Sequence, residues 1–422
     1  MLWGLLVLMP PAVSALGRDE VAETAARAQA AYKKKDYKAF LAESQGLTVL
    51  APHSVRAQYN LACAQSLNGH AAQAVGLLDQ LATGGAAFDV EADGDFAGLK
   101  TRPDFQAVVR KMKALDTPIG SSTLAFTLPE KTLLTEGIAY DPKSDAFFVS
   151  SVHRRKVLRV TRNGAVSDFV AEAQDGLLSA VALVVDPARR ALWVSSEAHP
   201  PMIGIRPEDA GRSFVFEYDL DTAKLRRRLG PPAGLADAHL SDIGLGPAGE
   251  LYVSDPESGR IYVLASGAEQ LKVLVDVGPL GSPQGLTWSE DGRWLFVADY
   301  TQGIARVDPR TGAVVLLAAP ADALLTGIDG LVFAHGSLVG IQNGIAPHKL
   351  LRLQLDDTAT RVAAVSVLER RNPLFDEPTL AVKVGGELYY VANSQWNHVR
   401  QDGSLDEEHM SPPAVLRLRL DW

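Results

Sequence analysis

The stretch Gly281–Tyr300 reads GSPQGLTWSEDGRWLFVADY and predicts two short strands joined by a tight turn. Its two apolar segments, GLTW and RWLFVA, flank the sequence Glu290-Asp291-Gly292. An Asp-Gly pair between alternating apolar residues is a strong hairpin signal. This stretch therefore predicts a β-hairpin.

The hairpin pattern recurs along the chain. The other copies begin near residues 136, 181, 241, 329 and 378 and read EGIAYDPKSDAFFVS, VALVVDPARRALWVS, SDIGLGPAGELYVSD, DGLVFAHGSLVGIQN and EPTLAVKVGGELYYVAN. The six copies are spaced roughly 40 to 60 residues apart. Repeats of this length that are rich in short strands predict a β-propeller with one blade per copy.

A propeller ring must close, because an open ring exposes the edges of its first and last sheets. Alternating strands are predicted at both ends of the repeat region, TLAFTL at 123–128 and AVLRLRL at 414–420. We expect these two strands to pair in one shared blade. The expected domain is a six-bladed propeller over residues 123–422.

Residues 18–115 change to a helical pattern, with small and apolar residues at spacings of three and four. Two segments, around KKKDYKAFLAES and NLACAQSLNGHAAQAVGLLDQLA, resemble tetratricopeptide repeats. We therefore expect a mainly β chain with an N-terminal α-helical module, joined to the propeller by a linker at 116–122. The module either binds a protein partner in a groove or stabilises the propeller, since so short an array needs neighbours for its apolar faces.

The first 17 residues, MLWGLLVLMPPAVSALG, are mostly apolar. The run is too short for a transmembrane helix and contains Val13-Ser14-Ala15, which resembles a signal-peptidase site. We expect a signal peptide over residues 1–17 and export to the periplasm or the medium. A buried N-terminal segment and an uncleaved anchor are the alternatives, and no later segment is predicted to span a bilayer.

Charge and cysteine content narrow the function classes. The net charge is −9, with no long Lys/Arg run, so no nucleic-acid partner is expected. The single cysteine, Cys63, excludes an intramolecular disulfide, and its Ala-rich surroundings predict a small core residue.

Aligning the six copies predicts polar side chains at one mouth of the channel, where inner strands begin and second strands end. The inner strands open at Glu136, Val181, Ser241, Gln284, Asp329 and Pro378, and the second strands end near His153, Glu197, His199, Asp255, Asp299, Asn343 and Asn393. Carboxylates without a cationic neighbour are costly to bury unless they are protonated or bind a cation. Oxygen donors from separate strands suit Ca²⁺, whereas a strand-ending Asp or Asn can instead cap the following turn.

Three motifs, Thr135-Glu136-Gly137, PQGLTWS at 283–289 with Asp291-Gly292, and Asp329-Gly330-Leu331, resemble the regucalcin/gluconolactonase family. The resemblance covers about residues 130–422 and implies a six-bladed propeller that hydrolyses lactones with calcium or zinc. It implies metal ligands at Glu136, Gln284 and Asp329, with Gln284 standing where the family has Asn. A further family Asn falls on Ser241, beside Asp242, and either residue can present an oxygen.

A bound cation would polarise a lactone or ester carbonyl and lower the pKa of a bound water, and a general base must then lie within reach. The resemblance implies Asp299 as this base. His153 and His199 are the other catalytic candidates, because imidazole titrates near neutral pH. The predicted substrate pocket consists of His239, Asn343, Asn393 and Trp396, the last in an insertion at 393–413; a second insertion, at 199–213, could form a lid.

Three functions fit these observations. The first is a metal-dependent hydrolase of lactones or small esters. The second is a non-catalytic propeller that binds a ligand, glycan or protein at its mouth, and the third is another enzyme on the same fold, such as a lyase that uses the histidines. Metal dependence separates the first from the second, and substitution of His153 and His199 tests the third.

Overall fold

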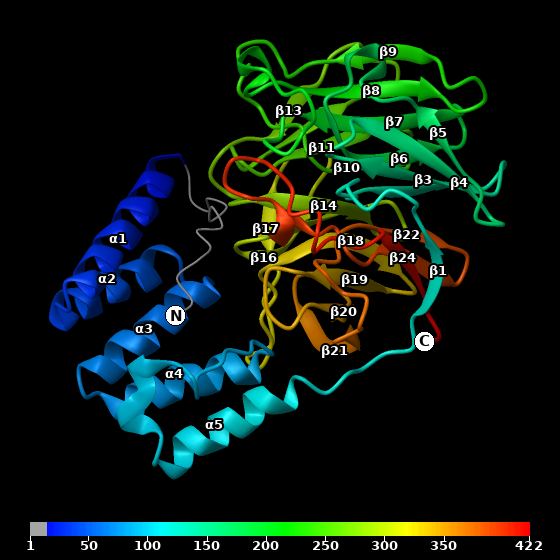
Figure 1. Ribbon diagram of the computed structural model, residues 1–422. Coiled ribbons are helices and arrows are strands. Elements are labelled where there is room, and N and C mark those ends of the chain that lie inside the picture. The colour runs from blue at the N-terminus through cyan, green and yellow to red at the C-terminus, as the bar shows by residue number, and fades with distance from the viewer. Residues whose placement is uncertain (1–14) are drawn as a thin grey trace.

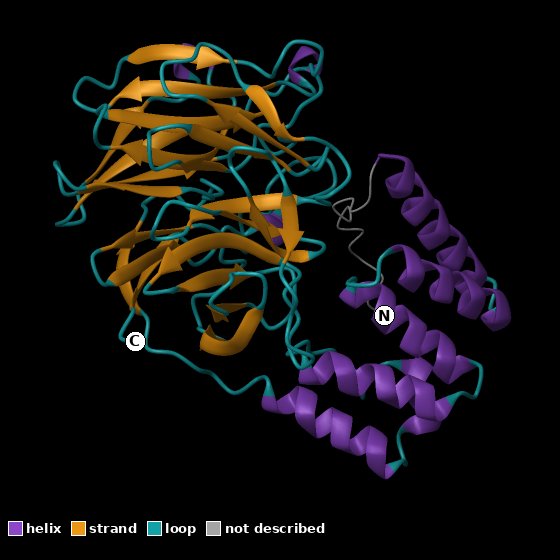
Figure 2. Cartoon of the chain, turned by 180° about the vertical axis from the view of Figure 1, so that it is seen from behind, coloured by secondary structure: helices purple, strands orange, loops and turns teal. Residues whose placement is uncertain are grey.

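The computed structural model describes residues 15–422 and contains a helical module followed by a β-propeller (Figures 1 and 2). The helices are α1 (Ala15–Lys33), α2 (Tyr37–Leu50), α3 (Val55–Leu67), α4 (Ala71–Thr83) and α5 (Pro103–Ala114), with the 3₁₀ helix η1 (Gly94–Leu99) before α5. The mainly β fold with an N-terminal helical module is therefore confirmed, whereas the tetratricopeptide interpretation stays a prediction.

Most of the predicted signal peptide, residues 1–14, lies outside the described residues. Between residues 15 and 422 no helix is long and apolar enough to cross a membrane.

Local signals explain where the helices start and what they bury. Asp36 and Ser54 accept hydrogen bonds from the backbone N–H groups of Ala39 (3.1 Å) and Ala57 (3.2 Å), which caps α2 and α3. Most of the apolar faces meet in a core that includes the lone cysteine, which is buried as predicted. The largest fully buried side chains of this core are Leu78, Leu81, Phe96 and Phe105.

After the helical module, the strands form six sheets of four strands, and each sheet is one blade of the propeller. From the channel outward, blade one is β2 (Ile138–Asp141), β3 (Ala146–Ser151), β4 (Lys156–Thr161) and β5 (Val166–Val170); blade two is β6 (Ser179–Asp186), β7 (Ala191–Glu197), β8 (Ser213–Asp219) and β9 (Leu225–Leu229); blade three is β10 (Ile243–Leu245), β11 (Leu251–Asp255), β12 (Arg260–Leu264) and β13 (Lys272–Val275). Blade four is β14 (Pro283–Trp288), β15 (Leu295–Asp299), β16 (Gly303–Val307) and β17 (Val314–Leu316), and blade five is β18 (Ile328–Ala334), β19 (Ser337–Gln342), β20 (Lys349–Leu355) and β21 (Val362–Arg370).

The sixth blade joins the two ends of the repeat region. Its strands are β22 (Ala381–Val384), β23 (Glu387–Val391), β24 (Ala414–Arg419) and, outermost, β1 (Thr123–Thr127). Strand β1 pairs antiparallel with β24, with Thr127 opposite Ala414. Phe147 of blade one packs against Tyr389 of blade six, with ring centroids 4.7 Å apart. The predicted closure and the six blades are therefore confirmed.

Buried serines fix the start of the inner strand in the first three blades. Each lies on the second strand of its blade, and its hydroxyl accepts a hydrogen bond from a backbone N–H on the inner segment. The pairs are Ser150 with Gly137 (2.7 Å), Ser195 with Ala182 (2.9 Å) and Ser254 with Asp242 (3.1 Å). These bonds hold the polar residues at the mouth in place.

The helical module packs against blade five at the same mouth (Figure 1). Leu324, before β18, and Ile345, after β19, pack into the helical core. The buried Nζ of Lys349 donates to the backbone oxygens of Gly85, just after α4 (2.8 Å), and Pro347 (3.2 Å). This docking supports the stabilising role among the two roles predicted for the module.

Lys349 makes this contact sensitive to pH. Burial, with a smaller contribution from the positive charge of Arg370, lowers the pKa of Lys349 to about 7. The unfolded-state pKa is about 10.4, so the native state is disfavoured fully below about pH 7 and progressively less as the pH rises toward 10.

Replacing Lys349 with Met should therefore stabilise the protein most at low pH. Relative to wild type, we expect the free energy of unfolding gained by Lys349→Met to be about 3 kcal/mol larger near pH 6.5 than near pH 9.5. Denaturant titrations at both values measure this difference. The exposed Lys383→Met serves as control, and a gain independent of pH would contradict the prediction.

Candidate active site

Oxygen-bearing side chains from five blades lie where the inner strands begin. They are Glu136, Asp242, Gln284, Asp329 and Glu377. Glu136 and Asp242 are only 9% and 4% exposed, and the other three are partly buried. Glu377 is an addition to the predicted set, because the sixth copy aligns with Pro378 at the strand opening and leaves its neighbour out.

The four carboxyl groups disfavour one another's ionisation. Burial raises the pKa of Glu136 and of Asp242 well above the usual range, and the charge of Asp329 adds to both effects. Burial also raises the pKa of Asp329 to about 6 and that of Glu377 to about 7, with Asp329 contributing at Glu377. None of the four forms an ion pair with another side chain of residues 20–422, the range in which side chains are described. Such a cluster either takes up protons or binds a cation.

Asp242 contributes a buried oxygen without a partner. Its Oδ2 forms no hydrogen bond, although the residue is almost completely buried. Asp242 lines a cavity of about 60 Å³ on the channel axis, whose other lining residues are apolar members of the inner strands such as Ile138, Leu286 and Leu331. The neighbouring Ser241 is also buried and fixed through its backbone N–H to Ser254 O (3.0 Å). An unsatisfied carboxylate oxygen in this position fits a cation site.

Asp329 is held by a hydrogen-bonded pair that includes one predicted pocket residue. Asn343 Nδ2 donates to Asp329 Oδ2 (2.7 Å), and Tyr300 Oη donates to Asn343 Oδ1 (3.1 Å). Burial raises the pKa of Tyr300, so its phenol remains a donor. Gln284 lies in the adjacent blade, and its side-chain nitrogen donates to Ser282 Oγ (3.4 Å). Its side-chain carbonyl oxygen is therefore the atom that could contact a cation.

The mouth carboxylates do not form a compact ligand set on their own. In the described part of the chain, the three-residue group of His, Cys, Asp or Glu whose ligand atoms lie within 4.8 Å of one another is Cys63, Asp93 and Asp95 in the helical module. There Tyr59 donates to Asp93 (2.7 Å), and burial raises the pKa of the Cys63 thiol. That group is therefore satisfied internally. A cation at the mouth would bring carboxylates from separate blades closer together.

A second charged group lies at the end of β7. The buried Glu197 contacts two imidazoles, with His199 Nε2 at 2.9 Å from Oε1 and His239 Nδ1 at 3.0 Å from Oε2. Burial opposes ionisation of Glu197, but the two imidazoles outweigh it and hold its pKa below the usual range. The hydrogen bond to Glu197 raises the pKa of His239. The structure thus brings the predicted residues His199 and His239 together through a carboxylate.

Trp396 connects the two groups. Its indole N–H donates to Glu136 Oε1, and its ring meets the ring of His199 edge-on with centroids 5.4 Å apart. Ser394 Oγ donates to the same oxygen of Glu136 (2.9 Å). Trp396, one of the residues of the predicted substrate pocket, therefore lies at the candidate site.

Asp299 is engaged in a turn instead. It is fully buried, and its carboxylate accepts hydrogen bonds from the backbone N–H groups of Gly281 (2.6 Å), Ser282 (3.2 Å), Thr301 (3.0 Å) and Gln302 (3.0 Å). Both oxygens are occupied by groups that hold the blade-four loops. This geometry matches the turn-capping alternative for a strand-ending Asp.

His153 and Asn393 fix the two long insertions. His153 Nδ1 contacts the backbone oxygen of Pro201, and burial lowers the pKa of the imidazole. Asn393 accepts from Ala414 N (2.7 Å) and donates to Pro412 O (3.2 Å), which joins the two ends of the blade-six insertion. Neither residue forms a hydrogen bond with the mouth carboxylates of the described chain.

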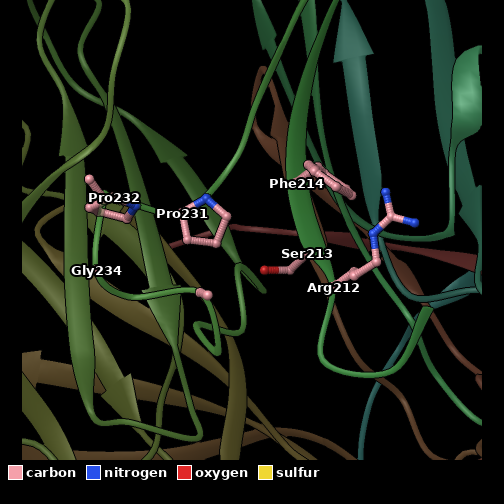
Figure 3. Close-up of a pocket in the computed structure, with 8 residues that line it drawn as sticks. Arg212, Ser213, Phe214, Pro231, Pro232 and Gly234 are labelled. Atoms are coloured by element: carbon pink, nitrogen blue, oxygen red, sulfur yellow. The ribbon is translucent and has the colours of Figure 1, made fainter. Parts of the chain in front are cut away.

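A larger cavity opens beside β8, whose Ser213 pairs with Glu197 at the end of β7. It measures about 330 Å³ and is lined by Arg212, Ser213 and Phe214 on one side and by Pro231, Pro232 and Gly234 on the other (Figure 3). The guanidinium of Arg212 lies 3.2 Å from Asp209 and 5.2 Å from the ring centroid of Phe214. Because this cation is already engaged and none of the predicted site residues lines the cavity, the candidate site remains at the mouth.

The fold and site define a six-bladed β-propeller with an acidic channel mouth. No protein-family model matches the chain, and no curated protein matches it by sequence. Among solved structures, the PQQ-bound aldose sugar dehydrogenase from Streptomyces coelicolor is 16% identical over 71% of this chain and 98% of its own, with a TM-score of 0.50. A gluconolactonase from Xanthomonas campestris is 16% identical over 72% of this chain and 92% of its own (TM-score 0.49), and a streptogramin B lyase is 12% identical over 71% and 97% (TM-score 0.48). Likeness at this level shows the fold alone.

The raised pKa of Glu377 predicts a pH-dependent stability. Its folded pKa lies above the unfolded value, so its contribution is fully present below about pH 4 and is lost as the pH rises through about 7. Without divalent cations, Glu377→Gln should therefore unfold with a free energy higher than wild type at about pH 8 by up to about 3 kcal/mol, and the gain should vanish near pH 4. Chemical denaturation in EDTA measures it. The exposed Glu408→Gln should show no such change, and equal gains at both pH values would contradict this account.

Proposed function

We propose that the protein is a divalent-cation-dependent hydrolase of lactones or small esters, with its site at the channel mouth. The observation that carries this proposal is the set of buried carboxyl groups of Glu136, Asp242 and Asp329. They come from three blades, form no ion pair with side chains of residues 20–422, and include an oxygen without a hydrogen-bond partner. A small-molecule substrate is the partner that this site implies.

The cation would be held by these three carboxylates and the carbonyl oxygen of Gln284. An all-oxygen donor set favours calcium, with zinc as the alternative. When bound, such an ion polarises a carbonyl and makes a bound water more acidic. The hydrogen bond from Asn343 would keep Asp329 oriented toward the mouth.

The general base in this proposal is His199. Its Nε2 contacts the ionised Glu197, so Nδ1 is the nitrogen that can take a proton from the attacking water, and Glu197 stabilises the resulting imidazolium. His199 is preferred to Asp299, because backbone N–H groups engage both oxygens of that carboxylate. It is preferred to His153 because its ring packs on Trp396, which donates to Glu136, whereas His153 Nδ1 contacts the backbone oxygen of Pro201. His239, on the other oxygen of Glu197, would contact the substrate.

A non-catalytic propeller that binds a ligand at its mouth is the second candidate. It is favoured by the separation of the mouth carboxylates, which do not lie within 4.8 Å of one another as a group of three. In this case the helical module would supply a further surface for a protein partner beyond its contact with blade five. Export remains a proposal that rests on residues 1–17.

Cation binding should raise the melting temperature of the whole chain. A ligand at about 100 times its dissociation constant stabilises a native state by about 2.7 kcal/mol. We therefore expect Ca²⁺, or failing that Zn²⁺, to raise the melting temperature of EDTA-treated protein by several degrees, and Glu136→Gln and Asp329→Asn to abolish the rise. The exposed Asp237→Asn near the same mouth should respond like wild type. No rise with Ca²⁺, Zn²⁺ or Mg²⁺ would exclude the proposed cation site.

Substitution of two histidines tests the assignment of the base. In the presence of the stabilising cation and a panel of lactones and esters, His199→Gln should lower kcat by about 10²-fold or more, since a general base contributes about 10²–10⁴-fold. His153→Gln should change kcat only by a small factor, because His153 contacts a backbone oxygen of the insertion. Steady-state kinetics on both variants measures these effects, and equal losses would contradict the role given to His199.

A further inference from the structure

Two donors from the blade-six insertion converge on one oxygen of Glu136. Oε1 accepts hydrogen bonds from Ser394 Oγ (2.9 Å) and from the indole N–H of Trp396. The other oxygen, Oε2, receives no hydrogen bond from residues 20–422, whose side chains the structure describes. The carboxylate is thus held in one orientation, with Oε2 available to a ligand.

We infer that Trp396 is a positioning residue for Glu136, which fixes the carboxylate through Oε1 and presents Oε2 to the cation at the mouth. This inference rests on the proposed function, because it assigns a role to a residue next to the proposed ion. A hydrogen-bond donor to a ligating carboxylate restricts its rotation, so the ion meets a ligand that is already oriented. Ser394 gives the second donor to the same oxygen.

Trp396 is itself held from the opposite side. Its ring packs edge-on against His199, which contacts Glu197 at 2.9 Å. Contacts therefore run from Glu197 through His199 and Trp396 to Glu136. They link the insertions of blades two and six to Glu136, which lies just before the inner strand of blade one. The proposed base and the proposed metal ligand are thus positioned by the same indole.

Hydrogen bonds and apolar packing hold the segment that carries Trp396. The neighbouring Gln395 is fully buried, donates to Ser411 O (3.0 Å) and accepts from Ser411 N (2.7 Å). Its φ of 69° lies in the left-handed region, which a non-glycine residue keeps only when its surroundings determine it. Trp396 packs against a small core of Leu134, Val152, Leu405 and Met410. The position of the indole is therefore set by the fold before any ligand binds.

The test compares two Trp→Phe substitutions in the full chain. Trp396→Phe removes the N–H but keeps an aromatic ring, and Ser394→Ala removes the other donor. The control is Trp288→Phe, because Trp288 Nε1 is buried without a hydrogen-bond partner. Calorimetric titration with Ca²⁺ alone, repeated with Zn²⁺, gives the dissociation constant without any substrate. We expect Trp396→Phe to weaken binding by about 10- to 100-fold, as loss of such outer contacts does, and Ser394→Ala to weaken it as well. Trp288→Phe should bind like wild type.

The outcomes separate this inference from the proposed function. If wild type binds the cation and folded Trp396→Phe binds it equally well, the positioning role is wrong and the cation site stands. If both Trp→Phe variants weaken binding to the same extent, the effect is one of general packing, and the inference is overturned. If wild type binds neither ion, the cation site and the inference fail together.

Discussion

The pairing of β1 with β24 is the interaction on which the rest of the structure depends. The N-terminal strand β1 becomes the outer strand of the sixth blade, beside the C-terminal strand β24. All six blades therefore have four strands. Once the ring is closed, every inner strand begins at the same mouth. Closure also brings blade six beside blade one, where the Thr379 hydroxyl donates to the backbone oxygen of Glu136 (3.0 Å). The acidic mouth is therefore a direct consequence of the topology.

Gathering carboxyl groups at the mouth makes their ionised forms unfavourable, and the packing of the blades holds the groups there despite this cost. Burial and mutual repulsion raise the pKa values of Glu136, Asp242, Asp329 and Glu377 together. Carboxyl groups with such raised pKa values in a concave site are typical of functional positions. On the other side of the Trp396 indole, Glu197 has the opposite character, since two imidazoles keep it ionised. Two carboxyl environments of opposite tendency fit the roles proposed for this mouth, one to hold a cation and the other to assist proton transfer.

The sequence predicted the parts of the fold that have a period. Six hairpin copies and two terminal strands were enough for the blade number and the closure, because each blade repeats the same local rule. The repeats also placed Glu136, Asp329 and Asn343 at the mouth. They did not distinguish Asp299 from these residues, because a strand-ending Asp looks the same whether it faces a ligand or caps a turn. Only the hydrogen bonds of its loops show the difference.

The remaining contacts depend on segments without a period. Glu377 was missed because it precedes the residue aligned at the strand opening. Tyr300 was missed because it follows Asp299 at the end of the hairpin stretch, where only Asp299 was considered for the site. The contact of Glu197 with His199 and His239 joins two loops of unrelated length, and no spacing rule predicts such a meeting. The docking of the helices on blade five likewise includes a contact of Lys349, which the sequence presents only as one more strand residue.

We propose that the closed ring makes a cation site from carboxylates of separate blades. Crystals of the full chain soaked in Mn²⁺, an oxygen-seeking ion with a measurable anomalous signal, would locate that site directly. We expect an anomalous peak at the channel mouth, within bonding distance of Glu136 and Asp329. A peak only at Cys63, Asp93 and Asp95, or none in the propeller, would contradict it.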